Sequence, residues 1–250
     1  MTTCPARTPP KSVYIMAFDR FDELDVVGPA AVLQTANRYL GDATRNPPGN
    51  PFTLRVVSVE GSGAVPYDGP DGTRWFVTGI HGLTLGTEPW DGSDLPDIVI
   101  VAGGDMADNA GIMRQMNNPA FTGVIARQHA RGAQVVSVCT GAFGLVGAGI
   151  AQGRRMTTHP GLVNQLAAEG VRVLNPDWDA RVVDDGSIIS CGGVTSGIDE
   201  ALYLVQTFWP DDPQLQSDVR NFVDFHYRSP IAMPHDREFV TGSAHESIQR

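Results

Sequence analysis

The sequence has few cysteines and few basic residues, and each shortage excludes a class of protein. Only three of its 250 residues are cysteines (Cys4, Cys139 and Cys191), and none lies in a CxxC pair, which argues against a disulfide-stapled scaffold. Lys and Arg total 18 against 28 Asp and Glu, so the formal net charge is −10. A chain this acidic, without a run of Lys or Arg, lacks the basic surface that binds nucleic acid or an anionic membrane.

The sequence also lacks a segment typical of export or membrane insertion. Residues 1–11 contain three prolines and no apolar run of signal-peptide length. Residues 132–153 carry no charge, but six glycines interrupt them. The first half of that stretch is β-branched and the second half is rich in small residues, which predicts a strand, a turn and a buried helix. We therefore expect a cytoplasmic protein.

Apolar runs of strand length alternate with helical patterns along the chain. Hydrophobic residues make up 42% of the sequence, enough for a sizeable core. The pattern predicts strands at 13–18, 52–59, 74–78, 97–102, 134–138, 155–158, 180–183 and 187–191. It predicts helices at 30–40, 105–131 with a break near 117–119, 140–151, 160–169, 196–208 and 211–227. This alternation indicates a single-domain α/β fold over residues 12–228, with a mostly parallel sheet sandwiched by helices. Residues 1–11 are expected to be a flexible start and residues 229–250 an irregular tail.

Cys139 is the first candidate for chemistry, because it directly follows a predicted buried strand. The small residues Gly141 and Ala142 come next, so the chain turns sharply from strand to helix at the cysteine. That arrangement resembles a nucleophile elbow. A helix N-terminus at this point would favour thiolate over thiol. The alternative is that Cys139 is simply a small buried hydrophobe.

Other polar or flexible residues end neighbouring strands, where ligands bind in sheets of this kind. Gly103 and Gly104 could bring backbone N–H groups to a substrate as an oxyanion hole, or form an ordinary tight turn. Asp25, expected in the strand-to-helix connection, could exchange protons with a thiol or merely be solvated. His159 could be a general base or a structural histidine.

Signals for metals and cofactors are missing. The sequence contains no GxxxxGK[ST] and no HExxH, and no two of the six histidines are four residues apart. We therefore expect neither a metal nor a cofactor. Cys191 also ends a strand, beside Gly192, but it lacks the context of an elbow.

Together these segments resemble the ThiJ/PfpI superfamily, whose members have the class I glutamine amidotransferase-like, flavodoxin-like α/β fold. The resemblance covers the chain from Val13 to about Pro234. Its anchors are LDVVGP (24–29), DIVIVAGG (97–104), VVSVCTGAFGL (135–145), RRMTTHP (154–160) and GGVTSGIDEAL (192–202). Five anchors in this order are specific for the fold but less so for the reaction, because the superfamily includes hydratases, glyoxalases, proteases, chaperones and sensors.

Within the superfamily, the chain most resembles the isocyanide (isonitrile) hydratase branch. The resemblance implies that Cys139 is the nucleophile, that Asp25 faces its thiol, and that Thr140 hydrogen-bonds the acid or the thiol. It implies attack on the terminal carbon of R–N≡C to give a covalent thioimidate, and hydrolysis by Asp25-activated water to an N-substituted formamide. It also implies a homodimer that acts on a small molecule.

One departure keeps other branches open. The pair His159 and Pro160 is more like glyoxalase and chaperone relatives, which predicts an alternative glyoxalase or deglycase reaction through Cys139 and His159. Against that branch, the acid is Asp25 rather than Glu and the residue after the cysteine is Thr140 rather than Ala. A protease would have histidine in that place. A non-enzymatic redox or ligand sensor is the third possibility, because a low-pKa thiolate oxidises readily.

Overall fold

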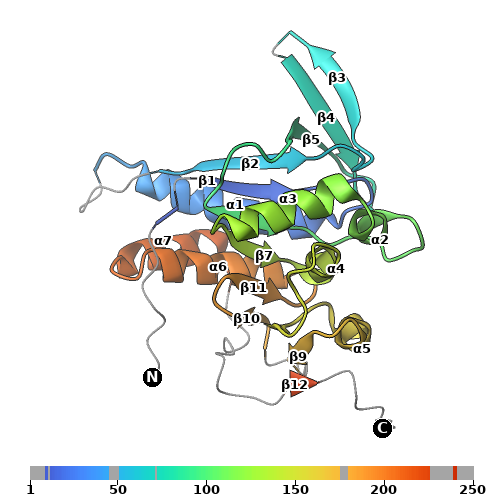
Figure 1. The fold of residues 1–250 in the computed structure, drawn as a ribbon. Coiled ribbons are helices and arrows are strands. Elements are labelled where there is room, and N and C mark those ends of the chain that lie inside the picture. Colours follow the sequence, from blue (N-terminus) through green and yellow to red (C-terminus); the bar gives the residue numbers. More distant parts are fainter. Residues whose placement is uncertain are drawn as a thin grey trace.

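A computed structural model describes residues 9–10, 12–44, 51–70, 72–174, 180–225 and 239–240. A nine-stranded sheet lies at its centre (Figure 1). Its strands are β1 (Ser12–Met16), β2 (Thr53–Ser58), β3 (Val65–Gly69), β4 (Gly72–Thr78), β5 (Thr84–Pro89), β6 (Ile98–Val101), β7 (Gln134–Ser137), β10 (Val182–Asp184) and β11 (Ile188–Cys191). They lie in the order β10-β11-β7-β6-β1-β2-β5-β4-β3.

The middle of this sheet is parallel. Strands β11, β7, β6, β1, β2 and β5 pair in parallel, whereas β10, β4 and β3 join antiparallel. The central order β2-β1-β6-β7-β11 is the 2-1-3-4-5 order of a flavodoxin-like sheet, and it confirms the predicted fold class. The strand order reverses between β1 and β6, so ligands are expected beyond the carboxyl ends of these strands.

Helices form two groups around the sheet. They are α1 (Glu23–Leu40), α2 (Gly111–Met116), α3 (Pro119–Ala130), α4 (Ala142–Gly147), α5 (Val163–Ala168), α6 (Ser196–Phe208) and α7 (Pro213–Val223). Helices α1, α6 and α7 pack together, and α2, α3 and α4 form a second group (Figure 1). The crossovers through α1 and α3 run in opposite directions along the sheet, and right-handed crossovers then place these helices on opposite faces.

Four strands escaped prediction because their patterns are weak or short. Strand β3 has no buried residue and β5 has one, and the two strands flank the predicted 74–78 arm. The hairpin of β3 and β4 projects beyond the main body (Figure 1). Strand β9 (Arg172–Leu174) has three residues and lies between β8 (Arg155–Met156) and β12 (Phe239–Val240) in a small second sheet. Strand β12 falls within the predicted tail, of which only residues 239–240 are described.

The start of α1 corrects the expectation that this helix begins after Pro29. The helix begins at Glu23, and Pro29 lies inside it. The Asp22 side chain caps the first turn by accepting a hydrogen bond from the Leu24 N–H at 3.1 Å. A Cβ added to Gly197 of α6 would lie 3.1 Å from the Pro29 ring, so the proline packs closely against the neighbouring helix. The cap and this packing together stabilise the helix by more than the loss of the backbone hydrogen bond that Pro29 cannot donate.

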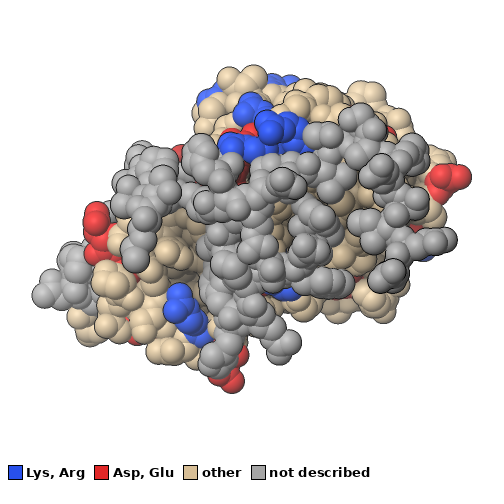
Figure 2. All heavy atoms as spheres, turned by 90° about the horizontal axis from the view of Figure 1, so that it is seen from below, with Lys and Arg blue, Asp and Glu red and all other residues tan. Residues whose placement is uncertain are grey.

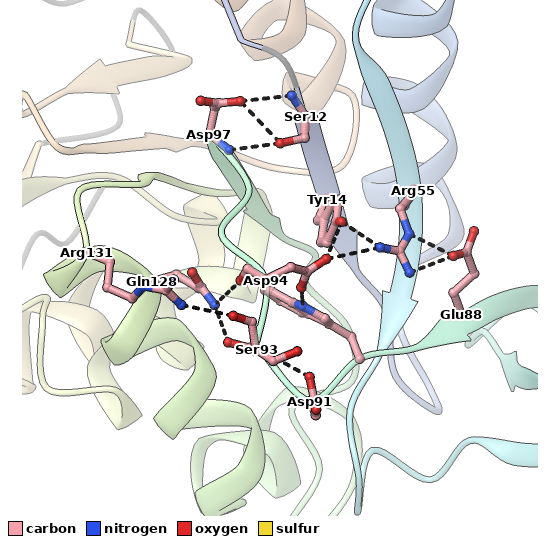
Figure 3. Close-up of polar contacts among 12 residues, drawn as sticks. Ser12, Tyr14, Arg55, Glu88, Asp91, Ser93, Asp94, Asp97, Gln128 and Arg131 are labelled. Atoms are coloured by element: carbon pink, nitrogen blue, oxygen red, sulfur yellow. Dashed lines mark hydrogen bonds and ion pairs between the residues drawn. The ribbon is translucent and has the colours of Figure 1, made fainter.

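A polar network joins three strands of the sheet (Figure 3). Arg55 of β2 contacts Glu88 of β5 at 2.7 Å, and its Nη1 lies 3.2 Å from the Asp94 carboxylate. The hydroxyl of Tyr14 in β1 donates to Asp94 at 2.5 Å, and the Trp90 indole N–H donates to the same carboxylate. Both acids of this network therefore have a cation beside them.

None of the described helices has the length and apolar character needed to cross a membrane. The uncharged stretch 132–153 instead forms β7, a short 3-10 turn over Cys139–Gly141 and α4. On the face drawn in Figure 2, the visible basic side chains of the described residues lie in small separate groups, with acidic side chains beside some of them.

Candidate functional site

Cys139 lies at a sharp turn beyond the carboxyl end of β7. Its φ is +56°, a left-handed conformation that costs a residue other than glycine about 1–3 kcal/mol. The Thr158 hydroxyl donates to the Cys139 carbonyl at 2.8 Å. A Cβ on Gly141 would lie 2.2 Å from the Val101 carbonyl, so the turn needs glycine there. These features are those of an elbow, although α4 runs only from Ala142 to Gly147, shorter than the predicted helix 140–151.

Asp25 lies beside this cysteine, in the first turn of α1 and not in the expected loop. Its side chain is completely buried. Oδ2 accepts a hydrogen bond from the Gly103 N–H at 3.0 Å. The carboxyl group lies close enough to the Cys139 sulfur for each group to shift the pKa of the other. The fold thus brings together two residues 114 positions apart in the sequence (139 − 25 = 114), as the resemblance implied.

Gly103 and Gly104 follow β6 and pack tightly against these groups. A Cβ on Gly103 would lie 2.6 Å from both the Asp25 carboxylate and the Thr140 hydroxyl. The Gly103 N–H donates to Asp25, and the Gly104 N–H donates to the Thr140 hydroxyl at 2.7 Å. Both N–H groups are therefore occupied, so in this structure the two glycines position side chains and form no open oxyanion hole.

Thr140 has a different partner from the one implied by the resemblance. Its hydroxyl exchanges two hydrogen bonds with Gly104, donating to the carbonyl at 3.0 Å and accepting from the N–H. Its backbone N–H points at the Cys139 sulfur and favours the thiolate. Thr140 therefore contacts the sulfur through its main chain, while its side chain ties the elbow to the loop after β6.

The charge environment corrects the expectation of a low-pKa thiolate. Burial raises the pKa of the Cys139 thiol well above its usual value, and the Asp25 charge raises it further. Burial and the Asp22 charge also raise the pKa of Asp25 well above its usual range, and the hydrogen bond from Gly103 offsets this only in part. The short turn at the elbow does not compensate for burial beside an acid.

His159 lies close to the elbow in sequence but has its own local partner. Its Nδ1 accepts a hydrogen bond from the Gly161 N–H at 3.1 Å and caps a short 3-10 turn. It lines a cavity of about 240 Å³ with Thr158, Gly193 and Ser196, among others. Thr158 also bonds the Cys139 carbonyl, so this cavity adjoins the elbow. No hydrogen bond joins His159 to Cys139 among the described residues.

Two residues that sequence reasoning passed over also lie in this cluster. Cys191 is completely buried at the end of β11, and its sulfur lies 3.5 Å from the carboxylate of Glu200, which is 1% exposed. The sulfur of Cys191 accepts a hydrogen bond from the Cys139 N–H. Burial, with a contribution from the Asp25 charge, raises the pKa of Glu200 well above its usual range. An acid directly before the apolar stretch 201–205 was the sequence signal that could have singled it out.

Two other places could hold a ligand. The ligand atoms of Asp22, Glu23 and His81 lie within 4.8 Å of one another, the spacing of a metal site. Glu23 already accepts hydrogen bonds from the N–H groups of His81 and Leu83 and contacts the His81 ring at 2.7 Å. This group therefore ties α1 to the turn before β5. A larger cavity, of about 600 Å³, lies between Trp75, Trp90 and the α3 residue Arg127.

Comparisons with known proteins agree with this geometry. The DJ-1/PfpI family profile matches residues 11–207. An isonitrile hydratase from Pseudomonas putida is 34% identical over 163 residues, which are 63% of this chain and 68% of the relative. A deglycase from Pyrococcus abyssi is 31% identical over 121 residues, 47% of this chain and 67% of the relative. A DJ-1 superfamily protein from Salmonella typhimurium superposes with a TM-score of 0.65 at 21% identity, covering 87% of this chain and 100% of that one.

Proposed function

The chain belongs to the DJ-1/PfpI family, and we propose that it is a cysteine-dependent lyase that hydrates isocyanides to N-substituted formamides. The observation that carries this proposal is the buried contact between Cys139 at the elbow and Asp25. The glyoxalase branch, as the resemblance describes it, has Glu where this chain has Asp25 and Ala where this chain has Thr140. The relative with isonitrile hydratase activity in its name supports the same choice.

In the first half-reaction, the sulfur of Cys139 attacks the terminal carbon of R–N≡C. The raised pKa keeps Cys139 as a thiol, so attack requires a base to take its proton. Ionised Asp25 accepts that proton and returns it to the former isocyanide carbon. The product is a thioimidate, R–N=CH–S–Cys139, in which a C–S and a C–H bond have formed.

In the second half-reaction, water adds to the thioimidate carbon. Asp25 takes a proton from the water, and the nitrogen gains a proton as the C–O bond forms. The C–S bond then breaks, the sulfur recovers a proton, and R–NH–CHO leaves. The net reaction adds one water to one isocyanide, so the chemistry needs no redox partner. Burial of Asp25 suits this double use, since a raised pKa brings a carboxyl group closer to neutral pH.

The substrate is proposed to enter through the 240 Å³ cavity beside the elbow. Its walls include the hydroxyl-bearing Thr158 and Ser196 and the backbone of Gly193, with Arg181 at one side. Arg181 is held by an ion pair with Asp199 and a 2.8 Å hydrogen bond to Thr195. A cavity of this size admits a small R group.

The second candidate function is a deglycase or glyoxalase reaction through Cys139 and His159. The deglycase relative and the place of His159 on the cavity wall favour it. The hydrogen bond from Gly161 to Nδ1 opposes it, since that nitrogen already has a donor. A sensor without turnover is the third candidate, and the raised pKa of Cys139 opposes it because a thiol oxidises more slowly than a thiolate.

We also propose that the protein is a homodimer. The hairpin of β3 and β4 exposes large apolar side chains, with Val65 at 65%, Tyr67 at 59% and Phe76 at 37% exposure. Exposed apolar groups in one patch mark an interaction surface. Light scattering should give twice the chain mass of 26.8 kDa, and Tyr67→Lys should shift the species toward the monomer.

The proposed reaction is tested by incubating the purified protein with an aryl isocyanide and following formamide formation. Cys139→Ala is the matched variant, and a methylglyoxal assay runs in parallel. We expect formamide from the wild type, none above background from the alanine variant, and a mass adduct on Cys139 during turnover. Consumption of methylglyoxal alone, abolished by His159→Ala, would instead support the deglycase reaction.

A further inference from the structure

The backbone of Cys139 is held by a second buried pair that the proposed reaction does not use. Cys191 and Glu200 come from β11 and α6, and both are almost fully shielded from solvent. Strands β11 and β7 pair Ser190 with Ser137, so the next residues place Cys191 beside the approach to the elbow. Cys139 follows β7 and Cys191 ends β11, so the two cysteines lie at the carboxyl ends of neighbouring strands.

A chain of hydrogen bonds links the elbow to this pair. The N–H of Cys139 donates to the Cys191 sulfur, and the Cys191 thiol donates to Oε2 of Glu200 across 3.5 Å. On the other side of the same residue, the Thr158 hydroxyl bonds the Cys139 carbonyl at 2.8 Å. Both backbone groups of Cys139 thus have partners, at a residue whose φ is +56°.

Glu200 carries a second, independent sign of a function beyond packing. Its Oε1 is buried and has no hydrogen-bond partner among the described residues. An apolar side chain would fill this place in a helix interior without the cost of burying an acid. The other oxygen of this acid does have a partner, because Oε2 accepts a hydrogen bond from the Cys191 thiol.

We propose that Cys191 and Glu200 are positioning residues, which hold the backbone amide of Cys139 so that its thiol stays against Asp25. The inference rests on the proposed function, since it takes Cys139 as the nucleophile. Glu200 acts only through Cys191, and neither residue contacts the substrate. A nucleophile displaced by a fraction of an ångström loses much of its rate, so the pair is expected to affect turnover more than binding.

Four variants test the proposal. Cys191→Ala removes the acceptor of the Cys139 N–H, whereas Cys191→Ser keeps an acceptor and a donor. Glu200→Leu removes the acceptor of the Cys191 thiol, whereas Glu200→Gln keeps one. Ile189→Val is the matched control, because Ile189 is also completely buried on β11 but lies outside the hydrogen-bond chain.

Two measurements are made on each variant. One is the alkylation rate of Cys139 by iodoacetamide, read from its peptide by mass spectrometry, which needs no turnover. The other is kcat and KM for the aryl isocyanide. For Cys191→Ala and Glu200→Leu we expect alkylation to rise about 10-fold and kcat to fall about 10-fold with KM within a factor of two. For Cys191→Ser and Glu200→Gln we expect both values within about threefold of the wild type.

The outcomes separate the two proposals. If Cys191→Ala melts at a lower temperature but matches Ile189→Val in alkylation and kcat, the pair is structural and the inference fails. If Cys191→Ala does not fold, the comparison of Glu200→Leu with Glu200→Gln decides in the same way. If the wild type does not hydrate isocyanides, the proposed function fails, while the alkylation rates still decide whether the pair positions Cys139.

Discussion

Two regions of the same sheet place their carboxyl groups in opposite environments. In the network of Figure 3, Asp94 and Glu88 are partly exposed, and the Arg55 guanidinium lies against both. At the elbow, Asp25 and Glu200 are buried, and each has one oxygen without a hydrogen-bond partner. No Lys or Arg forms an ion pair with either of these two acids among the described residues. The first arrangement stabilises the fold, whereas the second costs stability and supports the chemistry that we propose for this site.

The contrast also explains the state of the thiol. A cation beside Cys139 would favour the thiolate, as happens at many reactive cysteines. Here the neighbouring group is an acid, and it raises the pKa of the thiol together with burial. We therefore expect Cys139 to react slowly with general electrophiles and to react quickly only when Asp25 accepts its proton.

The largest effect is expected from Asp25→Asn. The amide keeps the shape of the side chain but cannot accept the thiol proton, so isocyanide turnover should fall by about 10²–10⁴-fold. The measurement is kcat/KM from formamide formation. Asp94→Asn makes the same chemical change in the other region and should stay within threefold of the wild type. Equal losses in both variants would contradict a special role for Asp25.

Arg55→Met should show the reverse pattern. It removes the cation between Glu88 and Asp94, and also the hydrogen bond from Nη1 to the Tyr14 hydroxyl at 2.5 Å. We expect a loss of about 1–2 kcal/mol in the free energy of unfolding, measured by urea denaturation, with activity unchanged. Activity loss without loss of stability would mean that the two regions are not independent.

The contribution of Asp25 to the free energy of unfolding is expected to depend on pH. The pKa of Asp25 is raised in the folded protein, so its contribution favours folding at pH values below its unfolded pKa and is lost as pH rises through the folded pKa. Asp25→Asn should therefore melt at a higher temperature than the wild type under neutral to alkaline conditions, by a few degrees for about 1 kcal/mol. The difference should shrink as the pH is lowered toward 4, near the ordinary pKa of aspartate. Calorimetry at several pH values measures it, and a difference that grows on acidification would refute the burial argument.

The smallest effect is expected from His159→Gln. Its ring lines the cavity and accepts a hydrogen bond from Gly161, but it has no hydrogen bond to Cys139. Glutamine can supply an acceptor to the Gly161 N–H. We expect isocyanide turnover within about threefold of the wild type. A 100-fold loss of isocyanide turnover would indicate that His159 is catalytic and would favour the deglycase reaction.

The apolar runs of the sequence were sufficient for the central parallel strands, and the family resemblance implied that Asp25 faces Cys139. Apolar runs such as 97–102 predicted the parallel strands, and the turn after 134–138 predicted the elbow at Cys139. Strands β3 and β5 were not predicted, because these exposed strands have no continuous apolar run. The start of α1 escaped because a proline looked like a boundary, whereas capping by Asp22 and packing against α6 decided it.

The electrostatics of the site could not be read from local sequence. The pKa of Cys139 depends on burial and on Asp25, which the fold brings from 114 positions away, and not on the short turn that follows the cysteine. The same holds for Cys191, which looked inert because its own surroundings lacked an elbow. Its partner Glu200 comes from a different element, and its contact with the Cys139 N–H exists only in the assembled sheet.

The pH dependence of the alkylation of Cys139 by iodoacetamide, in the wild type and in Asp25→Asn, tests most directly whether a buried acid without a cation controls this thiol. We expect the apparent pKa of Cys139 to fall in Asp25→Asn, so that alkylation becomes faster at neutral pH while isocyanide turnover is lost. An apparent pKa that stays the same or rises in the variant would contradict this expectation.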